Sequence, residues 1–245
     1  MNDVDNLPII TDELALMSEM IALERLEIIE LGCGNARIAR EMLSRFPGTR
    51  LTGVETDAVQ HIKNLETPQL GLTFLEAGAQ SIPAASASFD MAFMLKSLHH
   101  IPLNLMATAL NEIARVVRQG GYLYVSEPIY DGDLNEIVKL YNDEGVVRAA
   151  AQNALNEAVI DAQYWEQLGE RRFAMAVSWR NFEEFEQRMM RPTYSDHHLT
   201  DEKIAAVRKA FEARVKLKGP NFVRPMHVRL LGRLPTIHTD RADRS

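Results

Sequence analysis

The stretch Glu30-Leu31-Gly32-Cys33-Gly34-Asn35-Ala36 decides the fold of this chain. It closes an apolar run from Leu26 to Leu31, which predicts a buried strand, and it precedes a segment with apolar residues four positions apart, which predicts a helix. Glycines between a strand and a helix let the backbone approach a ligand closely, and the helix N-terminus offers unpaired N–H groups. The stretch therefore predicts a ligand-binding loop in an α/β fold.

Short apolar runs alternate with amphipathic helical segments through the first half of the chain. Five of these runs predict strands: Leu26–Leu31, Leu51–Val54, Leu72–Leu75, Met91–Leu95 and Tyr122–Val125. Strand and helix alternating five times indicates parallel strands joined by crossover helices on both faces of one sheet. We therefore expect a doubly wound α/β sheet.

Residues 131–180 interrupt this alternation and are helical in character. An insertion at this point leaves the sheet at the carboxyl edge of its strands, where open α/β folds bind ligands, so we expect a lid or substrate wall. The alternative is a segment that packs beside the sheet or forms the contact of a homodimer. Further helices are predicted from Asn181 and from Thr200, and a final strand from Met226 to Leu231.

A second acid strengthens the interpretation of the glycine loop. Glu55 closes the second predicted strand, 21 residues after Gly34, at a distance typical of a carboxylate that binds ribose hydroxyls. A nicotinamide-binding Rossmann enzyme is one alternative. Its motif requires glycine or alanine at position 37, where helix and strand pack closely, and Arg37 stands there.

The ordered motifs resemble those of the class I S-adenosylmethionine-dependent methyltransferases, with a type 11-like domain over about residues 26–130. The matching segments are Glu30 to Gly34, Glu55, Phe74–Pro83, Ser88–Asp90, Leu98–His100 and Arg118–Gly121. The resemblance implies a Rossmann-like doubly wound, mostly parallel seven-stranded sheet with a helical insertion after strand five. It also implies a single domain, 1–245, with a cofactor core at 26–130, an insertion at 131–180 and a C-terminal part at 181–235.

The resemblance further implies S-adenosyl-L-methionine as cofactor and a set of binding residues. These are Glu30, Gly32, Cys33, Gly34, Glu55, Thr56, Gly78, Ala79, Gln80 and Lys96. The sequence departs from the family pattern at three positions: Ala36 replaces a glycine, Gly78 replaces an acid near the adenine, and Gln119 replaces a proline. Only Gly78 affects the cofactor site, and we expect Gln80 or the backbone at Ala79 to supply the missing hydrogen bond.

Candidate catalytic groups follow the fourth and fifth strands. They are His99, His100, Glu127 and Tyr130. Histidine titrates near neutrality and suits general-base work on a hydroxyl or amine, although transfer by proximity alone needs no base. Lys96 stands where amino-methylating nucleic-acid enzymes of this superfamily carry Asn or Asp, which argues against that subclass. No metal site is predicted, because the adjacent His197 and His198 lack a suitably spaced third ligand.

Composition bounds the partners and the compartment. The chain has 245 residues and a formal net charge of −7, which argues against general nucleic-acid binding. A single cysteine and the absence of a signal-peptide pattern or a long apolar run lead us to expect a cytoplasmic protein without a membrane span. We expect a small-molecule substrate.

Two alternatives to that expectation stay open. The first is methylation of RNA or protein through residues 203–233, which carry nine basic side chains and one acidic side chain. A cofactor-binding protein without turnover is the other, because no residue is an unambiguous base.

Overall fold

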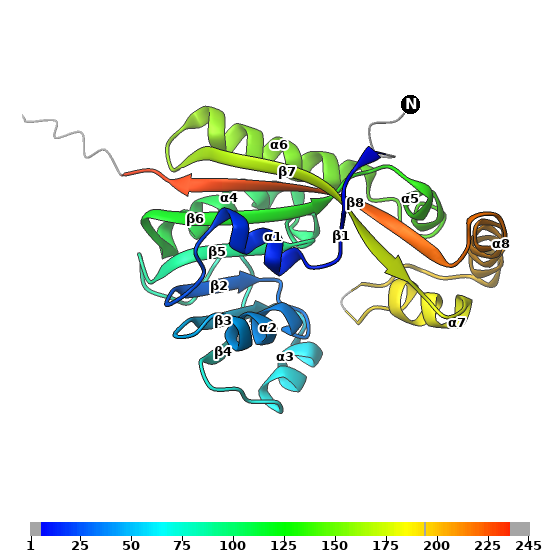
Figure 1. Ribbon diagram of the computed structural model, residues 1–245, viewed down its shortest axis with the longest axis horizontal. Helices are drawn as coiled ribbons and strands as arrows, with labels where there is room; N and C mark the ends of the chain where they lie inside the picture. The colour runs from blue at the N-terminus through cyan, green and yellow to red at the C-terminus, as the bar shows by residue number, and fades with distance from the viewer. Residues whose placement is uncertain (1–5, 194, 236–245) are drawn as a thin grey trace, which may run out of the picture.

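The computed structural model describes residues 6–193 and 195–235. One sheet of eight strands runs through the molecule in the order β1-β7-β8-β6-β5-β2-β3-β4 (Figure 1). The strands are β1 (Ile9–Ile10), β2 (Glu27–Leu31), β3 (Arg50–Glu55), β4 (Leu72–Glu76), β5 (Phe89–Leu95), β6 (Val117–Pro128), β7 (Trp165–Ser178) and β8 (Asn221–Arg233). Strands β2 to β6 pair in parallel, and β8 is antiparallel to β6 and β7. The mostly parallel, doubly wound sheet predicted from the sequence is confirmed.

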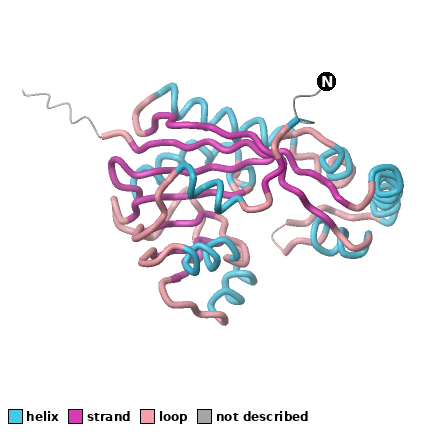
Figure 2. The backbone as a smooth tube through the Cα atoms, in the orientation of Figure 1, coloured by secondary structure: helices cyan, strands magenta, loops and turns pink. Residues whose placement is uncertain are grey.

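Helices cover both faces of this sheet (Figure 2). They are α1 (Glu13–Met20), α2 (Arg37–Arg45), α3 (Ala58–Leu65), α4 (Met106–Val116), α5 (Asp133–Val138), α6 (Gly145–Asp161), α7 (Phe182–Phe185) and α8 (Asp201–Lys218), with short turns η2 (Leu98–His100) and η3 (Leu103–Leu105) and a π-helical turn η4 (Glu186–Met190). Helices α4 and α6 pack in one apolar core, and α1 and α2 in the other. None of the helices in the described ranges is long and apolar enough to cross a membrane.

The central strands are buried on both faces, which explains why their sequences are continuous apolar runs. Ile29 and Ala92 face the core beneath α4 and α6, whereas Ile28, Met91 and Phe93 face the core beneath α1 and α2. Successive side chains of a strand point to opposite faces, so a strand covered on both sides must be apolar at every position. All five side chains are fully buried.

A third apolar cluster lies beyond the end of the parallel sheet. The long strands β7 and β8 extend past their neighbours and carry α5, α7 and α8 with them (Figure 1). At its centre Phe185 is fully buried, with its ring edge-on to Trp179 at 4.9 Å. Arg214 of α8 donates to Asp133 of α5 at 2.5 Å and ties the two helices together. This cluster forms a second, smaller packing unit beside the parallel sheet.

Two predictions about the second half of the chain are wrong. The helical insertion expected over 131–180 ends at Asp161, where Ala162 turns into the left-handed conformation (φ 47°), and residues 165–178 form strand β7. The sheet has eight strands instead of seven, because the two-residue β1 pairs with β7 at its outer edge. Strand β7 exposes one face to solvent, so much of its sequence is polar and lacks the apolar run that marks the central strands.

The third cluster gives a stability prediction. Phe185→Ala removes a fully buried ring that contacts Trp179, Phe182 and Phe211, so the free energy of unfolding should fall by about 3–5 kcal/mol in urea denaturation. Ile160→Ala, at an 82% exposed position of α6, is the matched control and should change it by less than about 0.5 kcal/mol. Equal effects of the two substitutions would contradict this packing.

Candidate active site

A cavity of about 760 Å³ lies along the carboxyl ends of the parallel strands. One side of it is lined by the segments that follow β2, β3 and β4, and the floor by the segment that follows β5. Helix α5, the start of α6 and, from the segment after α7, Met189, Ser195 and His197 line the opposite side. The cavity therefore joins the predicted cofactor loop to the helical insertion.

The glycine loop is held rigidly at the mouth of this cavity. The N–H groups of Gly32 and Cys33 donate to the carbonyl of Val54 at 2.9 and 3.0 Å. Gly32 has φ +73°, and a Cβ atom there would lie 2.6 Å from the Cβ of Ser97, so only glycine fits. Gly34 has φ +52° and no atom within 4 Å of where its Cβ would stand, which leaves its backbone open to a ligand.

Glu55 is bound to the same loop by its carboxylate. Its Oε2 accepts the N–H of Gly34 at 2.7 Å, and its Oε1 accepts the N–H groups of Thr56 and Asp57 at 2.8 and 2.9 Å. Both Glu55 and Thr56 line the cavity. The acid predicted to bind ribose hydroxyls therefore lies beside the glycine loop, with its position fixed by three backbone donors.

Gln80 fills the space left by the missing acid at position 78. A Cβ atom at Gly78 would lie 2.4 Å from the side-chain amide of Gln80, and Gly78, Ala79 and Gln80 all line the cavity. The amide offers both a donor and an acceptor at this place. That Gln80 replaces the acid as a hydrogen-bond partner of the cofactor stays a prediction.

Two predicted cofactor residues lie beneath the cavity and do not line it. Glu30 and Cys33 are buried, at 4% and 6% exposure. Burial raises the pKa of Glu30 to about 8, and its Oε2 has no hydrogen-bond partner among the described residues. Burial also raises the pKa of the Cys33 thiol far above its usual range, which makes it a packing residue.

Lys96 enters the cavity from the end of β5 with an unusual backbone. Its φ is +59°, and its N–H donates to the carbonyl of Ser126 at 2.8 Å. Its Nζ lies 3.9 Å from the buried carboxylate of Glu13 on α1, and burial lowers its pKa. The side chain thereby links the N-terminal helix to the cofactor side of the cavity.

His99 is the best-oriented of the predicted catalytic residues. Its Nδ1 is hydrogen-bonded to Oε2 of Glu127, whose Oε1 accepts the N–H of Leu98 at 2.9 Å. A carboxylate can only accept, so Nδ1 carries a proton, and in the neutral ring Nε2 then keeps its lone pair. Both residues are almost fully buried, yet His99 lines the cavity. Glu127 therefore acts on the cavity through His99.

The other two catalytic candidates differ in position. His100 lines the cavity and is exposed, with its ring centroid 4.1 Å from that of His99. Tyr130 is 38% exposed and does not line the cavity, and its hydroxyl donates to Asp143 at 2.6 Å. The structure therefore brings His99, His100 and Glu127 together and leaves Tyr130 outside.

The insertion supplies polar groups that sequence reasoning missed. Glu144 and Arg148, at the start of α6, line the cavity and form an ion pair at 2.5 Å, and Arg148 also donates to Asn135 at 3.0 Å. The three consecutive polar residues 142–144 could have indicated a site in the sequence, but only the fold brings them close to His99 and His100. Leu134 and Val138 of α5 add an apolar patch to the same wall.

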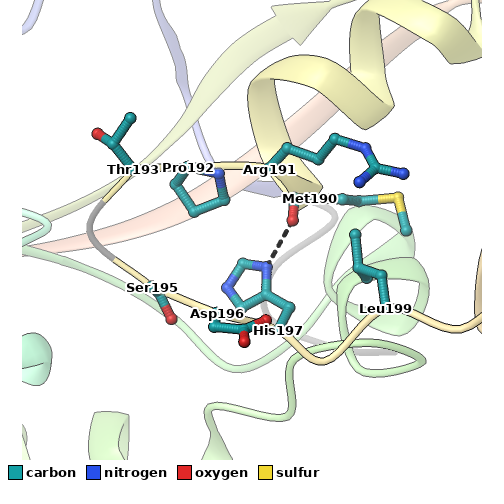
Figure 3. Close-up of a pocket in the computed structure, with 8 residues that line it drawn as sticks. All are labelled: Met190, Arg191, Pro192, Thr193, Ser195, Asp196, His197 and Leu199. Carbon is teal, nitrogen blue, oxygen red and sulfur yellow. Dashed lines mark hydrogen bonds between the residues drawn. The ribbon is translucent and has the colours of Figure 1, made fainter.

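A second hollow of about 560 Å³ is lined, among the described residues, by residues 190–193, 195–197 and Leu199 (Figure 3). Nδ1 of His197 donates to the carbonyl of Met190 at 2.9 Å across it. Ser195 and His197 also line the larger cavity, so the two hollows are neighbours. Because the two hollows share these lining residues, we treat the smaller one as part of the cavity wall.

Comparison with known proteins identifies the domain. The sequence model of the methyltransferase domain family matches residues 29–125. The O-methyltransferase rstn1 of Aspergillus nomiae is 31% identical over 108 residues, which cover 42% of this chain and 47% of that protein. A fatty-acid O-methyltransferase of Mycolicibacterium smegmatis is 27% identical over 135 residues, covering 54% and 48%. The chain spans about half the length of the curated relatives it matches.

The fold is shared with solved structures of distant sequence. It is similar to that of the YcgJ protein of Bacillus subtilis, with a TM-score of 0.62 over 91% of this chain and 98% of that one, at 15% identity. The matched segment, residues 29–125, contains the glycine loop and Glu55, and its similarity to methyltransferase domains supports a class I S-adenosylmethionine-dependent methyltransferase.

The residues of the cavity fit an S-adenosyl cofactor. The open backbone at Gly34 admits a ligand, Glu55 offers carboxylate oxygens to ribose hydroxyls, and Gln80 offers an amide to a base. The side chain of Glu30, whose Oε2 has no hydrogen-bond partner among the described residues, lies below this group as a buried acid with a raised pKa.

Burial of Glu30 gives a pH prediction. Its raised pKa means that the folded protein keeps a proton that the unfolded chain releases, so Glu30 costs stability as pH rises from its ordinary pKa of 4.5 toward about 8. Glu30→Gln should therefore gain free energy of unfolding relative to the unmodified protein, and the gain should grow over this range in urea titrations. Glu24→Gln, at an exposed position, should show no such trend. A gain independent of pH would contradict the buried neutral acid.

Proposed function

We propose that this protein transfers a methyl group from S-adenosyl-L-methionine to an oxygen atom of a small molecule. The observation that carries the proposal is the continuity of one cavity from the glycine loop and Glu55 to the Glu127–His99 pair. Both curated relatives described above are named O-methyltransferases, which supports an oxygen acceptor.

The cofactor supplies an activated methyl group, so the residues of this chain mainly bind, orient and remove a proton. Gly32, Gly34 and Glu55 hold the cofactor, with Thr56 and Gln80 beside them. Nε2 of His99 takes the proton of the acceptor hydroxyl, and Glu127 fixes the ring and stabilises the charge that forms on it. In-line displacement of the methyl group requires the acceptor oxygen to lie across the cavity from the glycine loop. The insertion lines that half of the cavity.

Helix α5, the start of α6 and the described residues 189–193 and 195–197 serve in this proposal as the substrate wall. Leu134 and Val138 provide apolar contact, and the Glu144–Arg148 pair provides polar selection. Thr193 hydrogen-bonds to Asp57, two residues after Glu55, so this wall already reaches the cofactor side. Opening and closing at this contact would make the wall a lid.

A small-molecule acceptor is favoured over RNA by the state of the basic segment 203–233. Arg208 pairs with Glu183, and Arg214 and Lys218 both pair with Asp133, so much of its charge is compensated within the fold. The Glu127–His99 pair favours turnover over a purely binding role. We place the activity in the cytoplasm, in keeping with the unpaired thiol of Cys33.

Binding of the cofactor gives the first test. Glu55→Gln keeps the size of the side chain and removes the carboxylate, so the Kd for S-adenosylhomocysteine should rise about ten- to hundred-fold in isothermal titration. Glu76→Gln is the matched control, because Glu76 is the register partner of Glu55 on β4, is exposed and does not line the cavity. An unchanged Kd for Glu55→Gln would refute its role.

Turnover gives the second test, with labelled S-adenosylmethionine offered to a panel of hydroxyl- and carboxyl-bearing small molecules and to RNA. With an accepted hydroxyl compound, His99→Asn and Glu127→Gln should each lower kcat by about 100-fold or more while cofactor affinity stays within about two-fold. His198→Asn, at an exposed position outside the cavity lining, serves as control. Labelling of RNA alone would overturn the proposal.

A further inference from the structure

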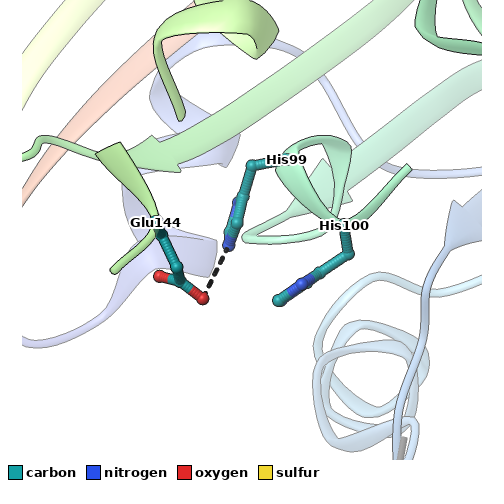
Figure 4. A group of neighbouring side chains, drawn as sticks. All are labelled: His99, His100 and Glu144. Carbon is teal, nitrogen blue, oxygen red and sulfur yellow. Dashed lines mark ion pairs between the residues drawn. The ribbon is translucent and has the colours of Figure 1, made fainter. Parts of the chain in front are cut away.

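Three metal-ligating side chains meet in the acceptor half of the cavity. His99 and His100 lie on the short turn η2 after β5, and Glu144 lies 44 residues beyond His100, at the start of α6 (Figure 4). One ligand atom from each residue can be chosen so that all three lie within 4.8 Å of one another. Nε2 of His99 is 3.9 Å from Oε1 of Glu144. In the described parts of the chain, no other group of three such residues comes this close.

Neighbouring residues already orient two of these ligands. Glu127 holds Nδ1 of His99, so the lone pair of Nε2 points toward Glu144. Arg148 holds Oε2 of Glu144 at 2.5 Å and leaves Oε1 facing His99, with Asn142 donating to that oxygen at 2.9 Å. A carboxylate behind a ligating imidazole is the usual supporting contact of protein metal sites.

The donor set selects the kind of ion. Two imidazoles and one carboxylate suit zinc and similar transition metals, whereas magnesium and calcium prefer oxygen ligands. Bonds of about 2.0–2.1 Å in a tetrahedral site place ligand atoms about 3.3 Å apart. The separation of 3.9 Å between His99 and Glu144 therefore closes with a small side-chain movement.

We propose that His99, His100 and Glu144 bind one divalent transition-metal ion of the zinc type, with its fourth position open to the cavity. The inference stands on these three side chains and does not depend on the proposed methyl transfer. A metal ion at this site would be bound by the lone pair on Nε2 of His99. The same lone pair would take the proton of the acceptor hydroxyl in the proposed methyl transfer. Metal binding and proton uptake by His99 therefore exclude one another, and zinc should inhibit transfer to a hydroxyl.

Titration of the full chain with Zn²⁺ after removal of metal by a chelator tests the site. We expect one ion per chain in isothermal titration and a visible absorption band with Co²⁺ in its place. His100→Ala and Glu144→Gln should each weaken Zn²⁺ binding by about ten-fold or more and abolish the Co²⁺ band. His198→Asn removes an exposed histidine paired with Asp196 and should bind Zn²⁺ as the unmodified protein does.

Binding of S-adenosylhomocysteine in the same samples separates this inference from the proposed function. Variants that keep this binding while losing Zn²⁺ are folded and support the metal site. Absence of one-to-one Zn²⁺ binding, or equal Zn²⁺ affinity in the unmodified protein and both variants, would overturn it. Loss of S-adenosylhomocysteine binding in the unmodified protein, by contrast, would contradict the proposed function and leave the Zn²⁺ comparison intact.

Discussion

Parallel pairing of β2 with β3 on one side and β5 on the other is the constraint on which the rest of the structure depends. Ile28 pairs with Leu51 and with Met91, so three strands end together at one edge. Their carboxyl ends deliver the glycine loop, Glu55 and the turn that carries His99 to the same place. Hydrogen bonds from the glycine loop to Val54 and Glu55 then connect the end of β2 to the end of β3.

The first half of this arrangement could be predicted from the sequence, because local patterns encode it. Apolar runs mark strands that are buried on both faces, and the acid–glycine spacing marks the loop. Strand β7 escaped prediction because its partners β1 and β8 are far away in sequence and its exposed face is polar. A register irregularity between Gln167 and Gly169 further disturbs the alternation that would identify a strand.

The site was predictable on its cofactor side and much less so on its acceptor side. Gly34 and Glu55 belong to a local motif, whereas Glu144 reaches His99 only through the packing of α6 against the turn η2 that follows β5. Burial was also hidden: Glu30 and Glu127 look like surface acids in the sequence, yet both are nearly inaccessible to solvent. Glu127 affects the cavity through its bond to His99, and Glu30 is a buried acid beneath the loop with a pKa raised to about 8.

The central claim is that cofactor and acceptor meet in one cavity, between the glycine loop and His99. A crystal structure of the full chain with S-adenosylhomocysteine tests it most directly. The account predicts ribose hydroxyls bound to Glu55, the adenine beside Gln80, and the sulfur atom facing the part of the cavity lined by His99. Binding of the ligand elsewhere, or with its sulfur turned away from His99, would contradict the account.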